Sequence, residues 1–205
     1  MTDFNERAQD WDSDPMKVER ACTVAEAIRA ALPITSGMTA LEYGCGTGLL
    51  SFALQADLGQ ITLADTSQGM LDVLNEKINA AGVANMHPLR LDLASDSLPN
   101  ERYHLIYSLM TLHHIHNTED ILKKFHTLLE PSGYLCIADL DKEDGSFHTD
   151  GTTDVHTGFD RPTLQRQVEA AGFGEIHFST AYEIKKKIGG TEKTFPVFLM
   201  TARKA

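Results

Sequence analysis

The chain has 205 residues, of which 42% are hydrophobic and 23% are charged, a composition typical of one soluble domain with a sizeable core. Its formal net charge of -11 repels phosphate backbones and disfavours nucleic-acid partners. The N-terminus is polar, no apolar run approaches the ~20 residues that span a bilayer, and the three cysteines form no C-x-x-C pair. We therefore expect a cytoplasmic protein without membrane insertion.

The first predicted helix begins at Asp14, which can cap it, has Pro15 in its first turn and ends at Leu32 before a proline. Short apolar runs then alternate with helical patterns. The apolar runs predict buried strands over Thr39–Tyr43, Ile61–Ala64, His87–Leu91, Tyr103–Ser108 and Tyr134–Ala138. Helical spacing predicts helices over Met70–Ala80 and Glu119–Leu129, the second capped by Asn117 or Thr118.

Alternating strands and helices predict a doubly wound α/β fold, in which a parallel sheet is covered on both faces. The last third of the chain differs. Residues 140–160 are polar and too long for a simple connection, so we expect them to carry function. A helix over Pro162–Ala171 follows. Two alternating segments, Glu175–Ile184 and Phe195–Ala202, then flank the loop KKKIGGTEK and predict an antiparallel hairpin.

The stretch LEYGCGTGLL places three glycines, Gly44, Gly46 and Gly48, directly after the first predicted strand. Glycines at a strand end let a ligand lie directly against the backbone. The dinucleotide fingerprint G-x-G-x-x-G would require a glycine at position 49, where this chain has leucine. Asp65 closes the second strand 19 residues after Gly46, near the offset at which an acidic residue binds ribose hydroxyls. The alternative is that Asp65 only caps the next helix, although Ser67 could cap it as well.

Five features in register carry a resemblance to a known family. They are the glycine stretch with its preceding glutamate, Asp65, the strand end LRLDLAS and the segments YSLMTLHHIHN and LLEPSGYLCIADL. Together they resemble class I S-adenosylmethionine (AdoMet)-dependent methyltransferases, in the branch similar to small-molecule and quinone-biosynthesis enzymes. The resemblance is strong over residues 38–139. It implies a Rossmann-like sheet of seven strands, mostly parallel, with an antiparallel last strand.

The resemblance also implies an organisation for the chain. We expect one methyltransferase domain over residues 1–205, in which residues 1–37 form a helical lid and residues 38–139 the cofactor-binding core. Residues 140–160 would lie over the acceptor site, and residues 161–205 would form the last helix and the hairpin. The reaction implied is in-line transfer of a methyl group from AdoMet to a small molecule, which leaves S-adenosyl-L-homocysteine.

Carried over residue by residue, the glycines would face the methionine and ribose parts of AdoMet, with Glu42 near its amino group. Asp65 would bind ribose, Met70 would pack on adenine, and Asp92 with Leu93 would hold the adenine edge. NERAQDWD resembles a covering segment, which makes Trp11 a lid candidate, although ordinary helix packing would explain it as well. The expected cofactor-binding set is Trp11, Glu42, Gly44, Cys45, Gly46, Gly48, Asp65, Thr66, Met70, Asp92, Leu93 and Ser108.

Candidates for the acceptor side lie in the loop after strand four and in residues 140–160. Imidazole titrates near neutral pH and can act as a general base, so His113, His114 and Asp139 are the catalytic candidates, and His148 and His156 the substrate-binding ones. So many histidines also raise the hypothesis of a metal. Without a C-x-x-C or H-E-x-x-H frame, we expect no metal site.

Two alternatives remain open from the residues. An NAD(P)-dependent oxidoreductase would use a similar sheet, although the glycine spacing is against it, and a non-catalytic binding module could retain the cofactor fold. No Asn/Asp-Pro-Pro-Tyr/Phe/Trp signature follows strand four, which disfavours nucleic-acid and release-factor substrates. The sequence fixes neither the acceptor atom, nor the use of a general base, nor the oligomeric state.

Overall fold

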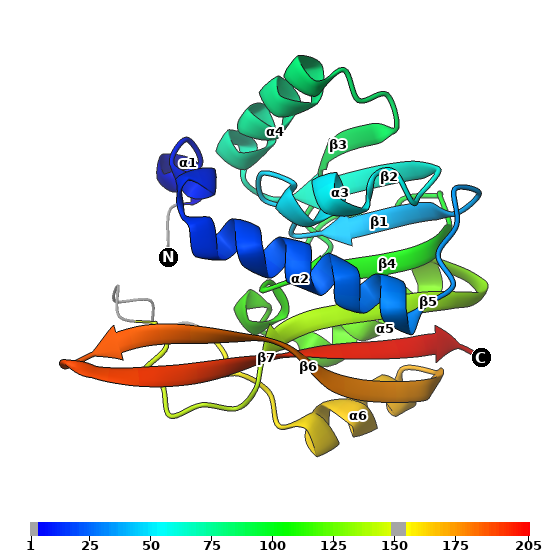
Figure 1. The fold of residues 1–205 in the computed structure, drawn as a ribbon. Coiled ribbons are helices and arrows are strands. Elements are labelled where there is room, and N and C mark those ends of the chain that lie inside the picture. The colour runs from blue at the N-terminus through cyan, green and yellow to red at the C-terminus, as the bar shows by residue number, and fades with distance from the viewer. Residues whose placement is uncertain (1–3, 149–154) are drawn as a thin grey trace.

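A computed structural model describes residues 4–148 and 155–205, and these form one sheet of seven strands in the order β3-β2-β1-β4-β5-β7-β6 (Figure 1). β1 to β5 are parallel to their neighbours. β7 runs antiparallel to both β5 and β6, so the predicted antiparallel last strand is confirmed. The strands are β1 (Thr39–Tyr43), β2 (Gln60–Asp65), β3 (Met86–Arg90), β4 (Tyr103–Leu109), β5 (Leu129–Leu140), β6 (Phe173–Ile188) and β7 (Thr191–Lys204).

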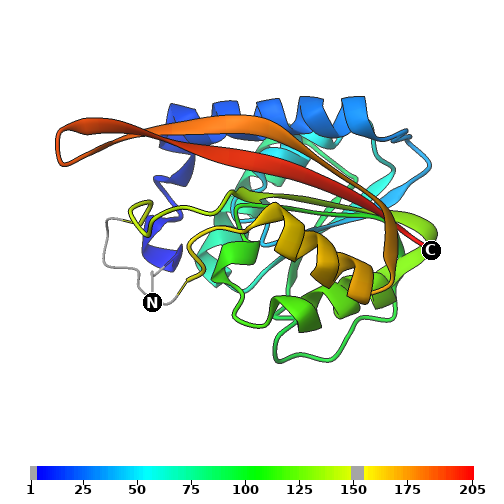
Figure 2. The same ribbon diagram turned by 90° about the horizontal axis from the view of Figure 1, so that it is seen from below.

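Helices cover both faces of the sheet (Figure 2). Apolar residues of α2, α3 and α4 pack in one buried cluster and those of α5 and α6 in another, as a doubly wound sheet requires. The predicted caps form: the side chains of Asp14, Ser67 and Asn117 accept the amides of Met16, Met70 and Asp120. The helices are α1 (Phe4–Arg7), η1 (Trp11–Ser13), α2 (Pro15–Ala31), α3 (Leu49–Leu54), α4 (Gln68–Ala81), η2 (Leu112–His114), α5 (Thr118–Leu128) and α6 (Arg161–Ala170).

The hairpin of β6 and β7 differs from its prediction. The expected loop KKKIGGTEK is mostly strand: Lys185–Lys187 pair with residues 192–194, and only Gly189 and Gly190 form the turn. Both glycines have positive φ, 56° and 86°, as tight two-residue hairpin turns of this kind need. The two strands therefore extend beyond the carboxyl ends of the central strands (Figure 1).

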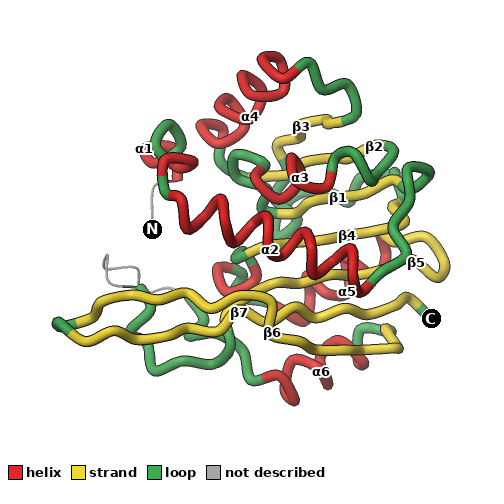
Figure 3. Tube along the Cα trace, viewed as in Figure 1, coloured by secondary structure: helices red, strands yellow, loops and turns green. Residues whose placement is uncertain are grey.

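The carboxyl ends of the parallel strands define the edge at which a ligand is expected. Strand order reverses between β1 and β4, and open α/β sheets bind ligands at that switch point. The described parts of residues 140–160 run as loop beside the long hairpin (Figure 3). Among the described residues, no helix combines the length and the apolar character needed to cross a membrane.

Candidate functional site

The glycine loop, residues 44–48, joins β1 to α3 at the switch point. Its three glycines have positive φ of 72°, 52° and 78°, a conformation that side chains disfavour. A Cβ on Gly44 would lie 2.2 Å from the Thr111 side chain, and one on Gly48 would lie 2.6 Å from Leu74. A Cβ on Gly46 would meet nothing closer than 3.8 Å. Gly44 and Gly48 therefore let the loop pack, whereas at Gly46 a side chain would not clash, and the half-buried backbone there faces Met70 and Trp11.

Asp65, at the carboxyl end of β2, fixes this loop from the side. One carboxylate oxygen accepts the Gly46 amide at 2.7 Å, and the other accepts the Ser67 amide at 2.8 Å. Burial raises the pKa of Asp65 even though these amides favour its charged form. Each carboxylate oxygen can accept a further hydrogen bond, so Asp65 can still bind a ligand's hydroxyl groups. Ser67 is the cap of α4, so the alternative role of Asp65 as that cap does not apply.

Glu42 lies beneath the loop rather than beside it. Its carboxyl group is buried and accepts the hydroxyl of Ser51, which lies 2.6 Å from the hydroxyl of Tyr107. Burial raises the pKa of Glu42 to about 8, so this group is mostly protonated at neutral pH. The structure thus makes Glu42 part of a neutral hydrogen-bonded network that supports the loop.

The turn after β3 holds Asp92 and Leu93. The Asp92 carboxylate accepts the amide of Ala94 at 2.9 Å and the hydroxyl of Ser95 at 3.1 Å. The Leu93 amide donates to the hydroxyl of Tyr43 at 3.1 Å. These bonds fix the position of the turn relative to β1, at the edge where the adenine contact is expected.

Three other predicted cofactor residues differ in exposure. Cys45 is buried, and burial raises its thiol pKa well above the usual value, which fits a packing role rather than a reactive one. Ser108 is buried in β4, opposite Ile137 of β5. Thr66 is exposed at the end of β2.

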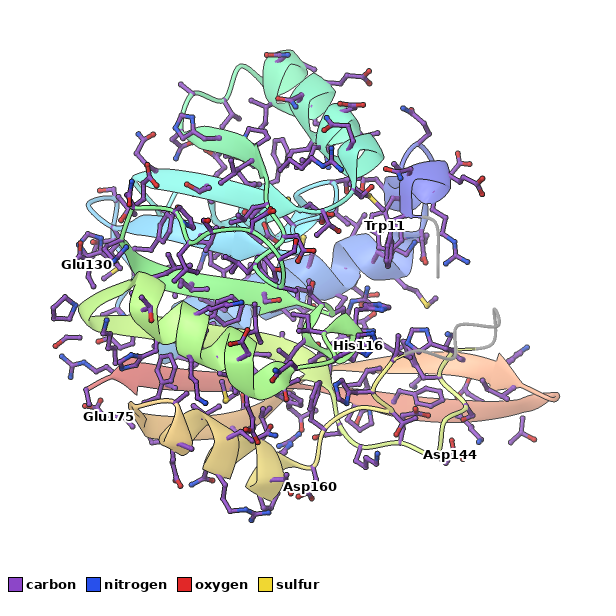
Figure 4. All side chains as sticks on the ribbon, turned by 180° about the vertical axis from the view of Figure 1, so that it is seen from behind. Trp11, His116, Glu130, Asp144, Asp160 and Glu175 are labelled. Carbon is purple, nitrogen blue, oxygen red and sulfur yellow. The ribbon has the colours of Figure 1, made fainter. Side chains whose placement is uncertain are left out.

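The N-terminal segment, residues 4–13, lies against the glycine loop and α4. The Asn5 side chain accepts the Ser67 hydroxyl and the Gly69 amide, both at 2.8 Å. The Trp11 indole nitrogen would be 3.9 Å from a Cβ on Gly46, and the Met70 sulfur 3.8 Å. Trp11 and Met70 therefore flank the half-buried backbone of Gly46. Figure 4 shows Trp11 at the edge where the parallel strands end.

Further contacts of this segment were not visible in the sequence. Asp12 accepts hydrogen bonds from the Thr47 hydroxyl and from the Lys77 ammonium, which also donates to the Thr47 carbonyl at 2.7 Å. Lys17 lies 3.6 Å above the Trp11 ring, a cation–π contact. No motif predicts such contacts, because they join residues up to 65 positions apart.

The loop after β4 brings the catalytic candidates together. The His113 Nδ1 lies 2.7 Å from one Asp139 carboxylate oxygen, and the His113 amide donates to the other at 3.2 Å. Burial would raise the pKa of Asp139, but the adjoining His113 and three hydrogen bonds hold it below its usual value. Since His113 donates from Nδ1, the other ring nitrogen, Nε2, carries the lone pair in the neutral imidazole.

His114 and His148 complete a cluster with His113. Ring centroids lie 4.1 Å apart for His113 and His114, and 5.3 Å apart for His113 and His148. Phe4 covers His114 edge-on at 5.4 Å, so the N-terminal segment reaches both the glycine loop and the histidines. The predicted cofactor residues and the predicted catalytic residues thus occupy neighbouring parts of one edge.

His156, the second substrate candidate, fastens residues 155–160 to the loop after β4. Its amide donates to the His113 carbonyl at 2.8 Å, and its Nε2 lies 2.9 Å from the Ile115 carbonyl. Through these two contacts His156 binds backbone carbonyl groups of the loop after β4. His116 is exposed at the same edge (Figure 4).

Comparison with known proteins agrees with this geometry. Residues 16–177 match a family model described as a methyltransferase domain. An uncharacterised methyltransferase of Schizosaccharomyces pombe is 34% identical over 120 residues, which cover 55% of this chain and 42% of that protein. A ubiquinone/menaquinone biosynthesis C-methyltransferase of Shewanella sediminis is 29% identical over 110 residues, which cover 52% of this chain and 44% of that protein. The match thus spans less than half the length of these relatives.

A solved structure shares the fold. Phosphoethanolamine N-methyltransferase 2 of Haemonchus contortus, in complex with AdoMet, superposes with a TM-score of 0.71 at 15% identity. The superposition covers 88% of this chain and 52% of that one. The family match extends over more than half of the chain and includes the glycine loop, Asp65 and the histidine loop. The chain therefore belongs to the class I AdoMet-dependent methyltransferase family, whose cofactor is S-adenosyl-L-methionine.

Proposed function

We propose that this chain transfers the methyl group of AdoMet to a small-molecule acceptor. The observation that carries the proposal is the half-buried backbone of Gly46, whose amide Asp65 accepts, next to a histidine cluster at the same edge of the sheet. A cofactor and an acceptor must lie side by side for in-line transfer, with reacting atoms about 3–3.5 Å apart. The neighbouring positions of the glycine loop and the histidine cluster at one edge support such an arrangement.

The residues around Gly46 fit AdoMet. Asp65 can accept hydrogen bonds from ribose hydroxyls, the Gly46 backbone can lie against the nucleoside, and Met70 and Trp11 offer apolar surface to its flanks. Asp92 and Leu93 would meet the adenine edge. When bound, AdoMet supplies a methyl group on a sulfonium, which is already an excellent leaving group. The protein's tasks are therefore to orient the acceptor and to exclude water.

The N-terminal segment serves as the lid in this proposal. Because Trp11 already approaches Gly46, the segment has to move outward to admit the cofactor and then close over it. Its contacts through Asn5 and Asp12 are polar, and water can take their place when the segment opens. The lid also carries Phe4, which covers His114, so closure would enclose the acceptor site as well.

The histidine side of the edge is the proposed acceptor site. Asp139 positions His113, and the described parts of residues 140–160 contribute His148 and the anchoring His156. A hydroxyl or thiol acceptor has to lose a proton before or during transfer. The histidine cluster is the group available there to promote that loss.

A small acceptor is consistent with the net charge of the chain and with the segments that cover the histidine cluster. The net charge of -11 disfavours polyanionic substrates, and aromatic residues from two segments, Phe4 and Phe147, pack over the histidines. The Shewanella sediminis relative is named as a C-methyltransferase of ubiquinone and menaquinone biosynthesis. These observations support a small-molecule acceptor and give no single identity for it.

Isothermal titration calorimetry tests the cofactor half of this proposal. We expect saturable binding of S-adenosylhomocysteine to the full chain and none of NADH. Asp65→Ala should weaken binding at least about tenfold, because hydrogen bonds to a charged partner are lost. Asp72→Ala, which removes an exposed carboxylate one helix turn into α4, is the matched control and should bind like the unaltered chain. Absence of saturable binding of both AdoMet and S-adenosylhomocysteine would contradict the proposal.

A further inference from the structure

Three histidines converge from two distant segments at the acceptor side. His113 and His114 belong to η2, and His148 lies in the connection after β5. Each offers one ring nitrogen, and the three nitrogens lie within 4.8 Å of one another. His113 is buried and the other two are partly buried. Imidazole nitrogens are common ligands of divalent transition-metal ions, and three of them this close can bind one ion together.

The contact between His113 and Asp139 prepares one of these nitrogens. A histidine that binds a metal usually donates its other N–H to a carboxylate, which fixes the tautomer and raises the basicity of the binding nitrogen. The Asp139 carboxylate is fully buried and 2.7 Å from His113 Nδ1. That arrangement directs the lone pair to Nε2.

The third histidine is held in place by the hairpin. Lys186 donates to the Phe147 carbonyl at 2.7 Å and lies 4.2 Å from the centre of the Phe147 ring. Phe147 in turn packs edge-on against His148 at 5.0 Å. Lys193 of β7 bonds Asp144 at 2.8 Å. The extended ends of β6 and β7, which replace the predicted loop, therefore stabilise the segment that contains His148.

We propose that His113, His114 and His148 bind a divalent transition-metal ion, with Zn²⁺ the best match, and leave its fourth position open to the methyl acceptor. Three protein ligands and one open position are typical of catalytic zinc sites. Zn–N distances of about 2.0–2.1 Å place tetrahedral ligand nitrogens about 3.4 Å apart, so the rings need only small rotations to close on the ion. No metal-binding motif is visible in the sequence, because His148 is remote from the pair His113–His114.

The chemical part of this inference rests on the proposed methyl transfer. A small molecule with a hydroxyl or thiol would occupy the open position, and coordination would lower the pKa of that group. Its proton passes to solvent. The oxygen or sulfur lone pair forms the new bond to the methyl carbon as the bond from that carbon to the sulfonium sulfur breaks. The sulfur keeps the electron pair, S-adenosylhomocysteine leaves, and neither oxidant nor reductant is needed.

Titration of the untagged, metal-free chain with Co²⁺, followed by visible absorption, tests the site without reference to activity. We expect one equivalent to bind with the intense bands of tetrahedral cobalt and Zn²⁺ to displace it. His148→Ala and His114→Ala should each abolish those bands. Asp139→Asn should weaken binding about 10–100-fold, as loss of a carboxylate behind a metal-binding histidine does. His177→Ala, at an exposed position on β6, should leave both spectrum and affinity unchanged.

Circular dichroism and thermal unfolding would establish that each variant is folded before its titration is read. Saturable tetrahedral binding that is lost in both histidine variants supports the site. A chain that gives no tetrahedral Co²⁺ spectrum, or a folded His148→Ala and a folded His114→Ala that both retain it, would overturn the inference. Titration of the metal-free chain with S-adenosylhomocysteine separates the two proposals. If the chain binds S-adenosylhomocysteine but not Co²⁺, only the metal-site proposal is refuted. If it binds Co²⁺ but not S-adenosylhomocysteine, the proposed function is refuted.

Discussion

The glycine loop and the histidine cluster lie at the same edge of one sheet, but they are assembled differently. The loop is five consecutive residues between β1 and α3, held by backbone bonds and by Asp65 from the neighbouring strand. The cluster needs η2, the end of β5 and the connection after it. The part of the edge proposed for the cofactor is thus centred on one local loop, whereas the part proposed for the acceptor depends on distant segments.

Among the substitutions that test how the histidine cluster is assembled, His113→Ala is expected to have the largest effect. This change leaves the fully buried Asp139 carboxylate without its cationic or hydrogen-bonding imidazole. Removal of one partner from a buried pair typically costs about 3–5 kcal/mol, so the free energy of unfolding in urea at pH 7 should fall by that amount. His114→Ala leaves the pair of His113 and Asp139 intact and should cost much less. Equal losses in the two variants would show that Asp139 does not depend on His113.

Glu42→Gln tests the network under the glycine loop. The folded-state pKa of Glu42, about 8, lies above its ordinary value of 4.5. The folded chain therefore holds a proton that the unfolded chain releases between those values, and stability falls as pH rises through this window by about 1.4 kcal/mol per pH unit. Glutamine cannot ionise. The difference in free energy of unfolding between Glu42→Gln and the unaltered chain should therefore shift in favour of the variant from pH 5 to pH 8.

Urea titrations of both chains at pH 5, 6, 7 and 8 measure that difference directly. Other groups titrate in this range, but they are the same in the two chains and cancel in the comparison. A difference that is independent of pH would mean that Glu42 is already charged in the folded protein at pH 5. The loop would then rest on a buried anion rather than on a neutral carboxyl group.

Alanine substitutions at two glycines of the loop distinguish a role in packing from a role in ligand contact. Alanine at Gly44 or Gly46 costs about 1–2 kcal/mol for its positive φ. At Gly44 the new methyl also overlaps Thr111, which should add about 1–3 kcal/mol. Gly46→Ala should therefore be the more stable variant in thermal unfolding, yet it should lose S-adenosylhomocysteine affinity, because its methyl projects toward Trp11 and Met70. Unchanged affinity would place the ligand elsewhere.

The parts of the fold that the sequence predicted are those set by local chemistry. Asp14, Ser67 and Asn117 cap their helices because short polar side chains reach the first free amides. The central strands are continuous apolar runs that only a sheet buried on both faces explains. The glycine loop and its pairing with Asp65 followed from one motif and one offset of 19 residues, whereas Met70 and Trp11 were expected there only from the family resemblance.

The parts that the sequence did not reveal depend on contacts across the fold. The Lys185–Lys187 run has the composition of a solvated turn, but cross-strand pairing with residues 192–194 keeps it in β6. Lys186 acts there by holding Phe147, 39 positions away. The contacts of Asn5 and Asp12 with the loop side are of the same kind. Neither periodicity nor spacing carries information about such pairs.

A crystal structure of the full chain with S-adenosylhomocysteine tests the central claim most directly. We predict that the ribose hydroxyls bind Asp65, that the nucleoside lies against Gly46, and that the thioether sulfur points toward His113, His114 and His148. A ligand bound away from Gly46, or one whose sulfur faces away from the three imidazoles, would contradict the account.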